Sequence, residues 1–327
     1  ENMLDTLGEM SRTDLYSYLK EWEQLTPLPF YSIGEPELTK VVNKGGEEFF
    51  VLKVLVSNNS DYDGIIQMNV LQNGWWYQPM EDPRARKKVE IAAHTSKEFV
   101  SVWEEQIRDV EINTMVSGNL PYMIRQSIGN VKQERNKIVK DTIYTLPESS
   151  LEMPGEVIVD NEDSTLFILS APPIVGLLPK WLDEVEETPF KYSGISWWRP
   201  PLQWTATTND RYYGKYIRSA FVIKSGDGSQ TATWKVPVPE VGQYDLYYHV
   251  FKDDELRWNN NLQGEYHFKV KYGSEVEDAY VNLRKANEGW EQLGSYYFDS
   301  DTIRVVLTDE CKLRSVTADA VKIVKRY

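Results

Sequence analysis

The sequence predicts an all-β protein: an N-terminal immunoglobulin-like β-sandwich with a leading helix, followed by a jelly-roll β-sandwich. Short runs rich in Val, Ile, Thr, Tyr, Phe and Trp recur along the chain, and 13% of its residues are aromatic. These residue types favour strands. Within the runs, apolar and polar residues alternate, as they do in half-buried strands. The 327 residues are enough for two domains, with three as the alternative.

One segment near the N-terminus has helical spacing. Residues 13–25, TDLYSYLKEWEQL, place Leu15, Leu19 and Trp22 on one face of a helix. Pro27 follows and ends the segment. We therefore expect a helix that leads into the first sandwich.

The first domain is predicted to cover residues 1–153. Its apolar runs alternate with period two and are separated by turn-rich segments, at intervals typical of an immunoglobulin-like sandwich. The expected strands are 48–58, 64–72, 87–93, 98–105 and 109–116, with a last strand within 137–146.

The second domain is predicted to cover residues 154–327. Pro154-Gly155 marks its start, and the boundary lies near 153, with 190 as the latest alternative. From residue 217 onward, about eight alternating runs with polar turns favour an antiparallel jelly roll. These runs are 217–223, 231–238, 242–251, 265–273, 277–283, 290–298, 302–309 and 318–325.

Charge and composition argue against several classes of protein. The formal net charge is −14. No stripe of basic residues is visible along the sequence, which argues against a partner made of nucleic acid. No apolar run approaches the roughly 18 residues of a membrane span, so no membrane insertion is expected. The single cysteine, Cys311, forms no internal disulfide and has no basic neighbourhood, so we interpret it as a small core or turn residue.

Four short motifs occur in order near the C-terminus. They are Tyr213-Gly214-Lys215-Tyr216, Gly242-Gln243-Tyr244, the run Trp290 to Phe298 (WEQLGSYYF), and Ala318-Asp319-Ala320-Val321. With them, residues 197–327 resemble the golvesin/xanthan-lyase carbohydrate-binding-like domain. The resemblance implies a galactose-binding-like or jelly-roll sandwich at the C-terminal end of a large secreted bacterial protein, a group that includes polysaccharide lyases. It does not make this chain a lyase, because function resides in sites rather than folds.

No catalytic residue is predicted. The HExxH, GxSxG, Walker and SxxK patterns are all absent. The three histidines are His94, His249 and His267, and a lone strand histidine is usually structural. A polysaccharide lyase needs a base and cations gathered around a uronate carboxylate, and no spacing here gathers them. If the chain has an activity, polysaccharide lyase is the class we expect.

No cofactor is predicted, and a structural calcium ion is the alternative. Asp61-x-Asp63-Gly64 and Asp160-x-Glu162-Asp163 are similar to parts of calcium-binding loops. Neither has the full twelve-residue pattern. We interpret the first as a hairpin turn and the second as a solvated strand end.

The best candidate for sugar binding is the loop DDELRWNNNLQGE, residues 253–265. Its Trp258 lies among Arg257, Asn259 and Asn260. Aromatic rings pack on the apolar faces of sugars, while Arg and Asn side chains bind hydroxyl groups. The alternative is a tryptophan folded back over the sandwich, with the asparagines making turn hydrogen bonds.

A second aromatic cluster lies in WWRPPLQWTATTNDRYYGKY, residues 197–216. Trp197, Trp198 and Arg199 precede two prolines that keep the segment extended. These three residues either face a ligand or, with Trp75-Trp76-Tyr77, cover the seam between the domains. The remaining aromatics are interpreted as structural. Tyr213 and Tyr216 belong to the first motif, Trp204 is expected in the core or at its rim, and the strand residues Trp234 and Trp290 are expected in the core.

The sequence therefore favours a non-catalytic, extracytoplasmic module of a larger secreted bacterial protein. Its expected partner is a polysaccharide or another cell-envelope glycan, with further domains of the same parent protein as neighbours. The alternatives are an accessory region of a polysaccharide lyase, and a purely structural assembly whose aromatics lie buried between the domains.

Overall fold

The computed structural model describes residues 28–72, 82–129, 131–135, 139–148, 151, 155–170, 191–196, 198–252 and 264–326. Within these ranges every regular element is a strand, apart from one 3-10 turn at Pro83–Ala85, and the all-β prediction is confirmed. None of these residues belongs to a helix that could cross a membrane. The predicted helix 13–25 lies outside the described residues. The chain forms two compact units, the first made of residues 1–122 and 127–150 and the second of residues 151–327 together with the short segment 123–126.

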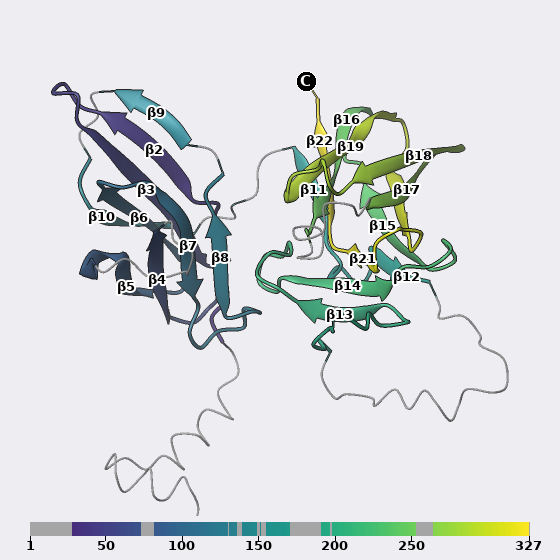
Figure 1. The fold of residues 1–327 in the computed structure, drawn as a ribbon, viewed down its shortest axis with the longest axis horizontal. Coiled ribbons are helices and arrows are strands. Elements are labelled where there is room, and N and C mark those ends of the chain that lie inside the picture. The colour runs from purple at the N-terminus through teal and green to yellow at the C-terminus, as the bar shows by residue number, and fades with distance from the viewer. Residues whose placement is uncertain are drawn as a thin grey trace, which may run out of the picture. The chain divides into compact units, whose positions relative to one another are not determined.

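The first unit contains two sheets (Figure 1). One has the order β10-β6-β3-β2-β9, with β1 also paired to β3, and the other has the order β5-β4-β7-β8. The β2–β9 ladder is parallel, whereas β1, β2 and β6 pair with β3 in antiparallel fashion. The strands are Tyr31–Ile33 (β1), Glu37–Val42 (β2), Glu48–Asn58 (β3), Gly64–Gln72 (β4), Arg86–Ile91 (β5), Thr95–Trp103 (β6), Ile107–Asn113 (β7), Met123–Ser127 (β8), Val131–Arg135 (β9) and Thr142–Pro147 (β10).

The two sheets of this unit share one hydrophobic core, which makes the unit a β-sandwich. Alternate residues of β3 and β6 point inward and meet residues of β4 and β7. Trp103 is the largest of these buried side chains, and its Nε1–H donates to Ser101 Oγ at 2.8 Å, which satisfies the indole. The Asn119 side chain bonds both the N–H and the carbonyl of Tyr31, at 2.9 and 2.8 Å, and so holds the short strand β1.

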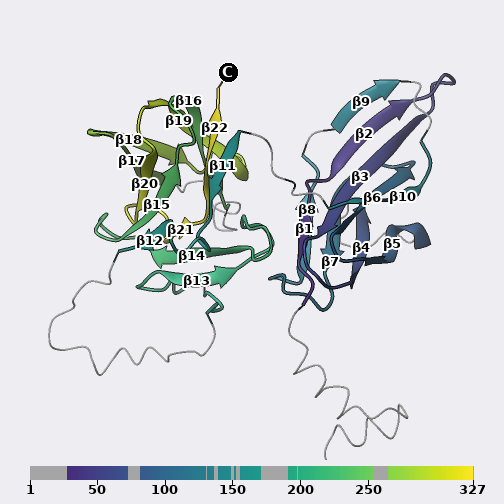
Figure 2. The same ribbon diagram turned by 180° about the vertical axis from the view of Figure 1, so that it is seen from behind.

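The second unit contains three sheets (Figure 2). Their orders are β11-β22-β16-β19, β12-β15-β20-β17-β18 and β13-β14-β21. The ladders between its described strands are all antiparallel. The strands are Glu156–Val159 (β11), Phe167–Leu169 (β12), Thr205–Thr208 (β13), Ser219–Lys224 (β14), Thr231–Pro237 (β15), Gly242–Val250 (β16), Glu265–Tyr272 (β17), Glu275–Asn282 (β18), Gly289–Phe298 (β19), Thr302–Thr308 (β20), Ser315–Ala318 (β21) and Val321–Lys325 (β22).

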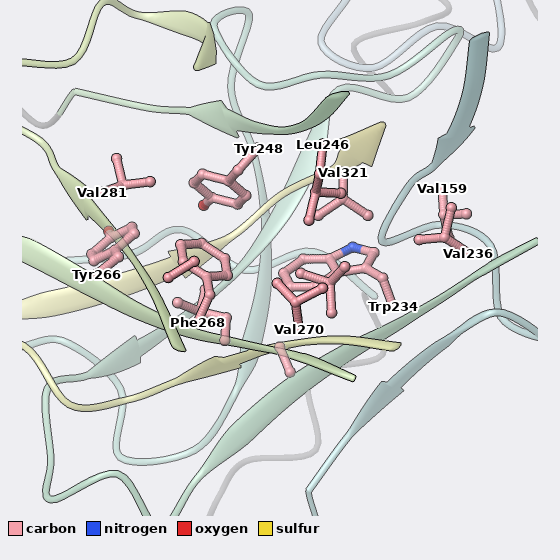
Figure 3. Close-up of a cluster of buried hydrophobic side chains, with 14 of the residues drawn as sticks. Val159, Trp234, Val236, Leu246, Tyr248, Tyr266, Phe268, Val270, Val281 and Val321 are labelled. Atoms are coloured by element: carbon pink, nitrogen blue, oxygen red, sulfur yellow. The ribbon is translucent and has the colours of Figure 1, made fainter. Parts of the chain in front are cut away.

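The core of the second unit lies between the four- and five-stranded sheets, and Figure 3 shows its aromatic centre. Trp234 is fully buried, as its strand position predicts. Its Nε1–H donates to the Asp319 carbonyl oxygen at 3.2 Å. The Tyr248 ring packs 4.9 Å from that of Phe268 and 6.2 Å from that of Trp234. Burying one such ring stabilises the fold by roughly 1.5–3 kcal/mol.

Candidate functional site

The predicted sugar-binding residues divide into two groups. Trp258, with its neighbours Arg257, Asn259 and Asn260, lies outside the described residues, and so does Trp197. Trp198 and Arg199 are described, and both are exposed. The site below is therefore built around Trp198.

Backbone hydrogen bonds fix the loop that carries Trp198. The Arg199 N–H donates to the Ser196 carbonyl oxygen at 2.9 Å and closes a turn around Trp198. Two prolines follow, and the carbonyl oxygen of Pro201 accepts from the N–H of Lys224, the last residue of β14, at 2.7 Å. The loop is thus tied to the end of a strand.

The residue after β14 brings in a second segment. The Ser225 N–H donates to the Arg314 carbonyl oxygen at 3.0 Å, which places the residue before β21 beside the same strand end. The Arg314 guanidinium carbon lies 5.0 Å from the Trp198 ring centroid. That distance is within cation–π range. The strand register therefore joins two residues that are far apart in the sequence.

The resulting surface is aromatic, apolar and cationic; we call Trp198, Leu202 and Arg314 the Trp198 surface. Trp198 is 80% exposed even with the guanidinium over its ring, and Leu202 is 69% exposed. The loop thus presents two large apolar side chains to solvent. A ring of this kind stacks on the apolar face of a sugar, and a neighbouring guanidinium donates to hydroxyl or carboxylate oxygens. Leu202 and Arg314 are additions to the predicted set, and only the strand register identifies Arg314.

Two further tryptophans, Trp204 and Trp290, are less exposed than Trp198. Trp204 is partly buried against the core, as its structural interpretation predicts. The interpretation of Trp290 as a core residue is wrong in part, because its side chain is half-buried. It packs against the rings of Tyr213 and His249, both at 5.1 Å, and Lys322 Nζ lies 4.8 Å from its ring centroid. Between Leu246 and Tyr247 of β16 the register with β19 shifts by one residue and leaves Leu293 of β19 without a partner, which interrupts the regular alternation of this ladder.

A buried carboxylate links the first and last of the four motifs. The Asp319 carboxylate receives the Tyr213 N–H at 3.2 Å and lies 2.8 Å from Nδ1 of His249. Burial raises the pKa of Asp319, and the His249 charge and hydrogen bond act against that rise. The motif residues Tyr213 and Asp319 therefore hold the fold together, as the structural interpretation of Tyr213 predicts.

The glycine of the first motif meets a strict steric requirement. Gly214 has φ 153°, and a Cβ atom there would lie 1.9 Å from the carbonyl oxygen of Ile217. No side chain fits at that distance without a backbone shift. Glycine is therefore the residue that this backbone position requires.

The other two histidines also pair with carboxylates. His267 Nε2 lies 2.7 Å from Asp278 Oδ1. His94 lies 2.8 Å from both Asp61 and Glu148, and these hydrogen bonds raise its pKa. Every histidine thus makes a contact that serves the structure.

In the two loops that are similar to parts of calcium-binding loops, carboxylates bond to other groups of the chain. The Asp63 carboxylate accepts from the Ala93 N–H at 2.8 Å, and that of Asp163 accepts from the Asp160 N–H at 2.8 Å. Glu162 pairs with Lys191 and accepts from Tyr192. Cys311 is half-buried against the core, and burial raises the pKa of its thiol, in keeping with a small core residue.

Residues 200–325 match the Golvesin C-terminal domain. The match falls within the predicted span 197–327 and confirms the resemblance. The Golvesin C-terminal domain accounts for less than half of the chain and includes Leu202 and Arg314 of the Trp198 surface. Trp198 itself lies two residues before its start.

Comparison with solved structures gives only distant similarity. Against Paenibacillus xanthan lyase the identity is 17%, over 92% of this chain and 27% of that chain, with a TM-score of 0.37. Against Bacteroides uniformis beta-glucuronidase the identity is 10%, over 89% of this chain and 30% of that chain, with a TM-score of 0.23. The chain spans less than a third of either enzyme. No curated protein matches it.

Proposed function

We propose that this chain is a non-catalytic module that binds carbohydrate or another cell-envelope component for a larger secreted bacterial protein. The observation that carries the proposal is Trp198, 80% exposed with the Arg314 guanidinium 5.0 Å from its ring centroid. An exposed tryptophan ring beside a guanidinium is an arrangement on which a sugar ring can stack. The site of action is extracytoplasmic, where such polymers occur.

In this proposal the two sandwiches have different roles. The first unit is an immunoglobulin-like spacer, and the second is a jelly roll of galactose-binding-like form that carries the Trp198 surface. A shallow aromatic surface gives weak affinity. The module therefore acts by holding a larger protein near its polymer, where a high effective concentration compensates for weak binding.

A glycan array with the full chain tests the proposal. We expect wild type to bind at least one glycan. Trp198→Ala should weaken that binding about tenfold, which corresponds to about 1.4 kcal/mol. Trp258→Ala, in the other predicted loop, is measured in parallel.

Tyr297→Ala is the matched control, because Tyr297 is another exposed aromatic of the same unit, at 59% exposure. This variant should bind like wild type. Two results would reject the proposal: a folded wild type that binds no glycan, or a Trp198→Ala variant whose binding equals that of the control.

A further inference from the structure

Three cations form a row on the outward face of the five-stranded sheet of the second unit. Arg304 of β20 lies directly opposite Lys235 of β15 on one side and Lys271 of β17 on the other. Their neighbours Trp234 and Val305 are fully buried. Because side chains alternate along a strand, the three cations point away from the core. We call Lys235, Arg304 and Lys271 the cation row; Figure 2 shows its three strands side by side.

The cation row is not explained by ion pairing. Its members have no ion pair among the residues that the structure describes, although the chain has 50 acidic and 36 basic residues. Other cations of the same unit do pair, as Lys322 does with Glu156 at 2.9 Å. Like charges directly opposite each other on neighbouring strands destabilise a sheet. The cation row therefore costs stability.

An aromatic ring lies farther along the same face. In the register, Lys269 opposite Asp278 follows the cation row, and His267 opposite Tyr280 comes next. The Tyr280 ring is 56% exposed and lies parallel to the His267 ring, with centroids 4.9 Å apart and an interplanar angle of 8°.

The Asp278 carboxylate holds His267 at 2.7 Å, so the exposed ring of Tyr280 rests on a fixed support. Lys269 adds a fourth cation between this ring and the cation row, and it too has no ion pair among the described residues. One sheet face thus combines cations for carboxylates with a ring for a sugar.

We propose that this face binds an anionic polysaccharide whose sugars carry carboxylates, with the carboxylates on the cation row and a sugar ring on Tyr280. The proposal rests on the glycan-binding function above and specifies the charge class of the ligand. A polyuronate carries at most one charge per sugar. Duplex DNA carries one per about 1.7 Å. The protein has a net charge of −14, so it repels a densely charged polymer such as duplex DNA more strongly than a polyuronate, whose charges are farther apart. A polyuronate is therefore the better fit.

Affinity electrophoresis of the full chain tests this proposal. The probes are polygalacturonate, its highly methyl-esterified form, and polyuridylate. We expect polygalacturonate to retard the wild type, with an effect that declines as salt is raised. The esterified polymer, which has the same backbone without the charge, should retard it much less.

The decisive variant is Lys235→Gln/Arg304→Gln/Lys271→Gln. Its Kd for polygalacturonate should rise about tenfold or more. Its thermal transition should occur at or above that of wild type, since two like-charge pairs are removed. The control is Lys44→Gln/Arg86→Gln/Lys88→Gln, which makes the same change in net charge at exposed residues of the first unit. It should bind polygalacturonate like wild type.

Three outcomes would overturn the proposal: equal retardation by the charged and esterified polymers, a cation-row variant that binds like its control, or a preference for polyuridylate, which would indicate a nucleic-acid surface. Neutral glycans distinguish a failure of this proposal from a failure of the proposed function. If Trp198→Ala abolishes binding to a neutral glycan while the cation-row variant keeps it, the glycan-binding function stands without this face.

Discussion

Nδ1 of His249 lies 2.8 Å from Oδ2 of Asp319, a carboxylate with no exposed surface. The same carboxylate receives the backbone N–H of Tyr213. One buried group therefore joins β16 to the loop that precedes β14. The contact connects the Tyr213-Gly214 motif to the Ala318–Val321 motif, whose Asp319 lies between β21 and β22.

Replacing this carboxylate should unfold the second unit more easily. Asp319→Ala leaves the Tyr213 N–H and the His249 ring without their acceptor. Leaving a buried hydrogen-bonding group without its partner costs about 1–3 kcal/mol. Calorimetry of the full chain should show one transition shifted down, with a smaller shift for Asp319→Asn, which keeps one acceptor oxygen. An unchanged transition in Asp319→Ala would show that the pair contributes nothing.

Asp160 should make the second unit less stable as pH rises. Burial, then the charge of Asp319, raises the pKa of Asp160 well above its ordinary value. A carboxyl group whose pKa is higher in the folded than in the unfolded state contributes fully to stability at a pH below its unfolded-state pKa. That contribution is lost as the pH rises through its folded-state pKa. Asp160→Asn should therefore melt above wild type at about pH 7, and the difference should narrow towards about pH 4.

Asp227→Asn serves as the control for this pH dependence. Hydrogen bonds from Ser229 lower the pKa of the exposed Asp227 carboxyl. Its contribution to stability has the opposite pH dependence to that of Asp160. It is present at a pH above the pKa of Asp227 in the unfolded state and is lost as the pH falls. Asp227→Asn should not raise the melting temperature at about pH 7. Identical behaviour of the two variants would refute the assignment of the effect to Asp160.

Gly214 should not tolerate alanine. The added Cβ would lie 1.9 Å from the Ile217 carbonyl oxygen, and backbone has to move to relieve the clash. The expected loss exceeds about 1 kcal/mol, measured as a lower melting temperature of the second unit. Gly194→Ala is the control, because no atom lies within 4 Å of the position of its Cβ. Equal melting of the two variants would contradict the steric argument.

His94 should stabilise the first unit most at low pH. Hydrogen bonds to Asp61, then to Glu148, raise its pKa. The stabilisation is fully present at a pH below the pKa of His94 in the unfolded state. It disappears as the pH rises through the pKa of His94 in the folded state. His94→Asn, chosen because Asn accepts the positive φ of 51° at this position, should lower the melting temperature at about pH 5 and change it little at about pH 8. A deficit that stays constant across this range would point to packing instead.

Period-two alternation was sufficient to predict the longer strands. The runs at 48–58 and 64–72 coincide with β3 and β4, and the run at 242–251 corresponds to β16. Each has one strongly apolar face that must be buried. The short strands β1, β2, β8 and β9 were missed, and so was β21. β1 has only three residues, and β9 exposes most of its side chains. Their pairing depends on partners that local pattern does not reveal.

The sequence by itself determined the β class, the longer strands and the match to the Golvesin C-terminal domain, because alternation and motif order are local properties of the chain. Only the tertiary structure decided which residues meet. Arg314 reaches Trp198 because hydrogen bonds tie both segments to the end of β14. Lys235 and Lys271 flank Arg304 because three strands from separate parts of the chain pair in one register. The cation row is not visible as a basic stripe in the sequence, because hydrogen bonding between distant strands assembles it rather than spacing along the chain.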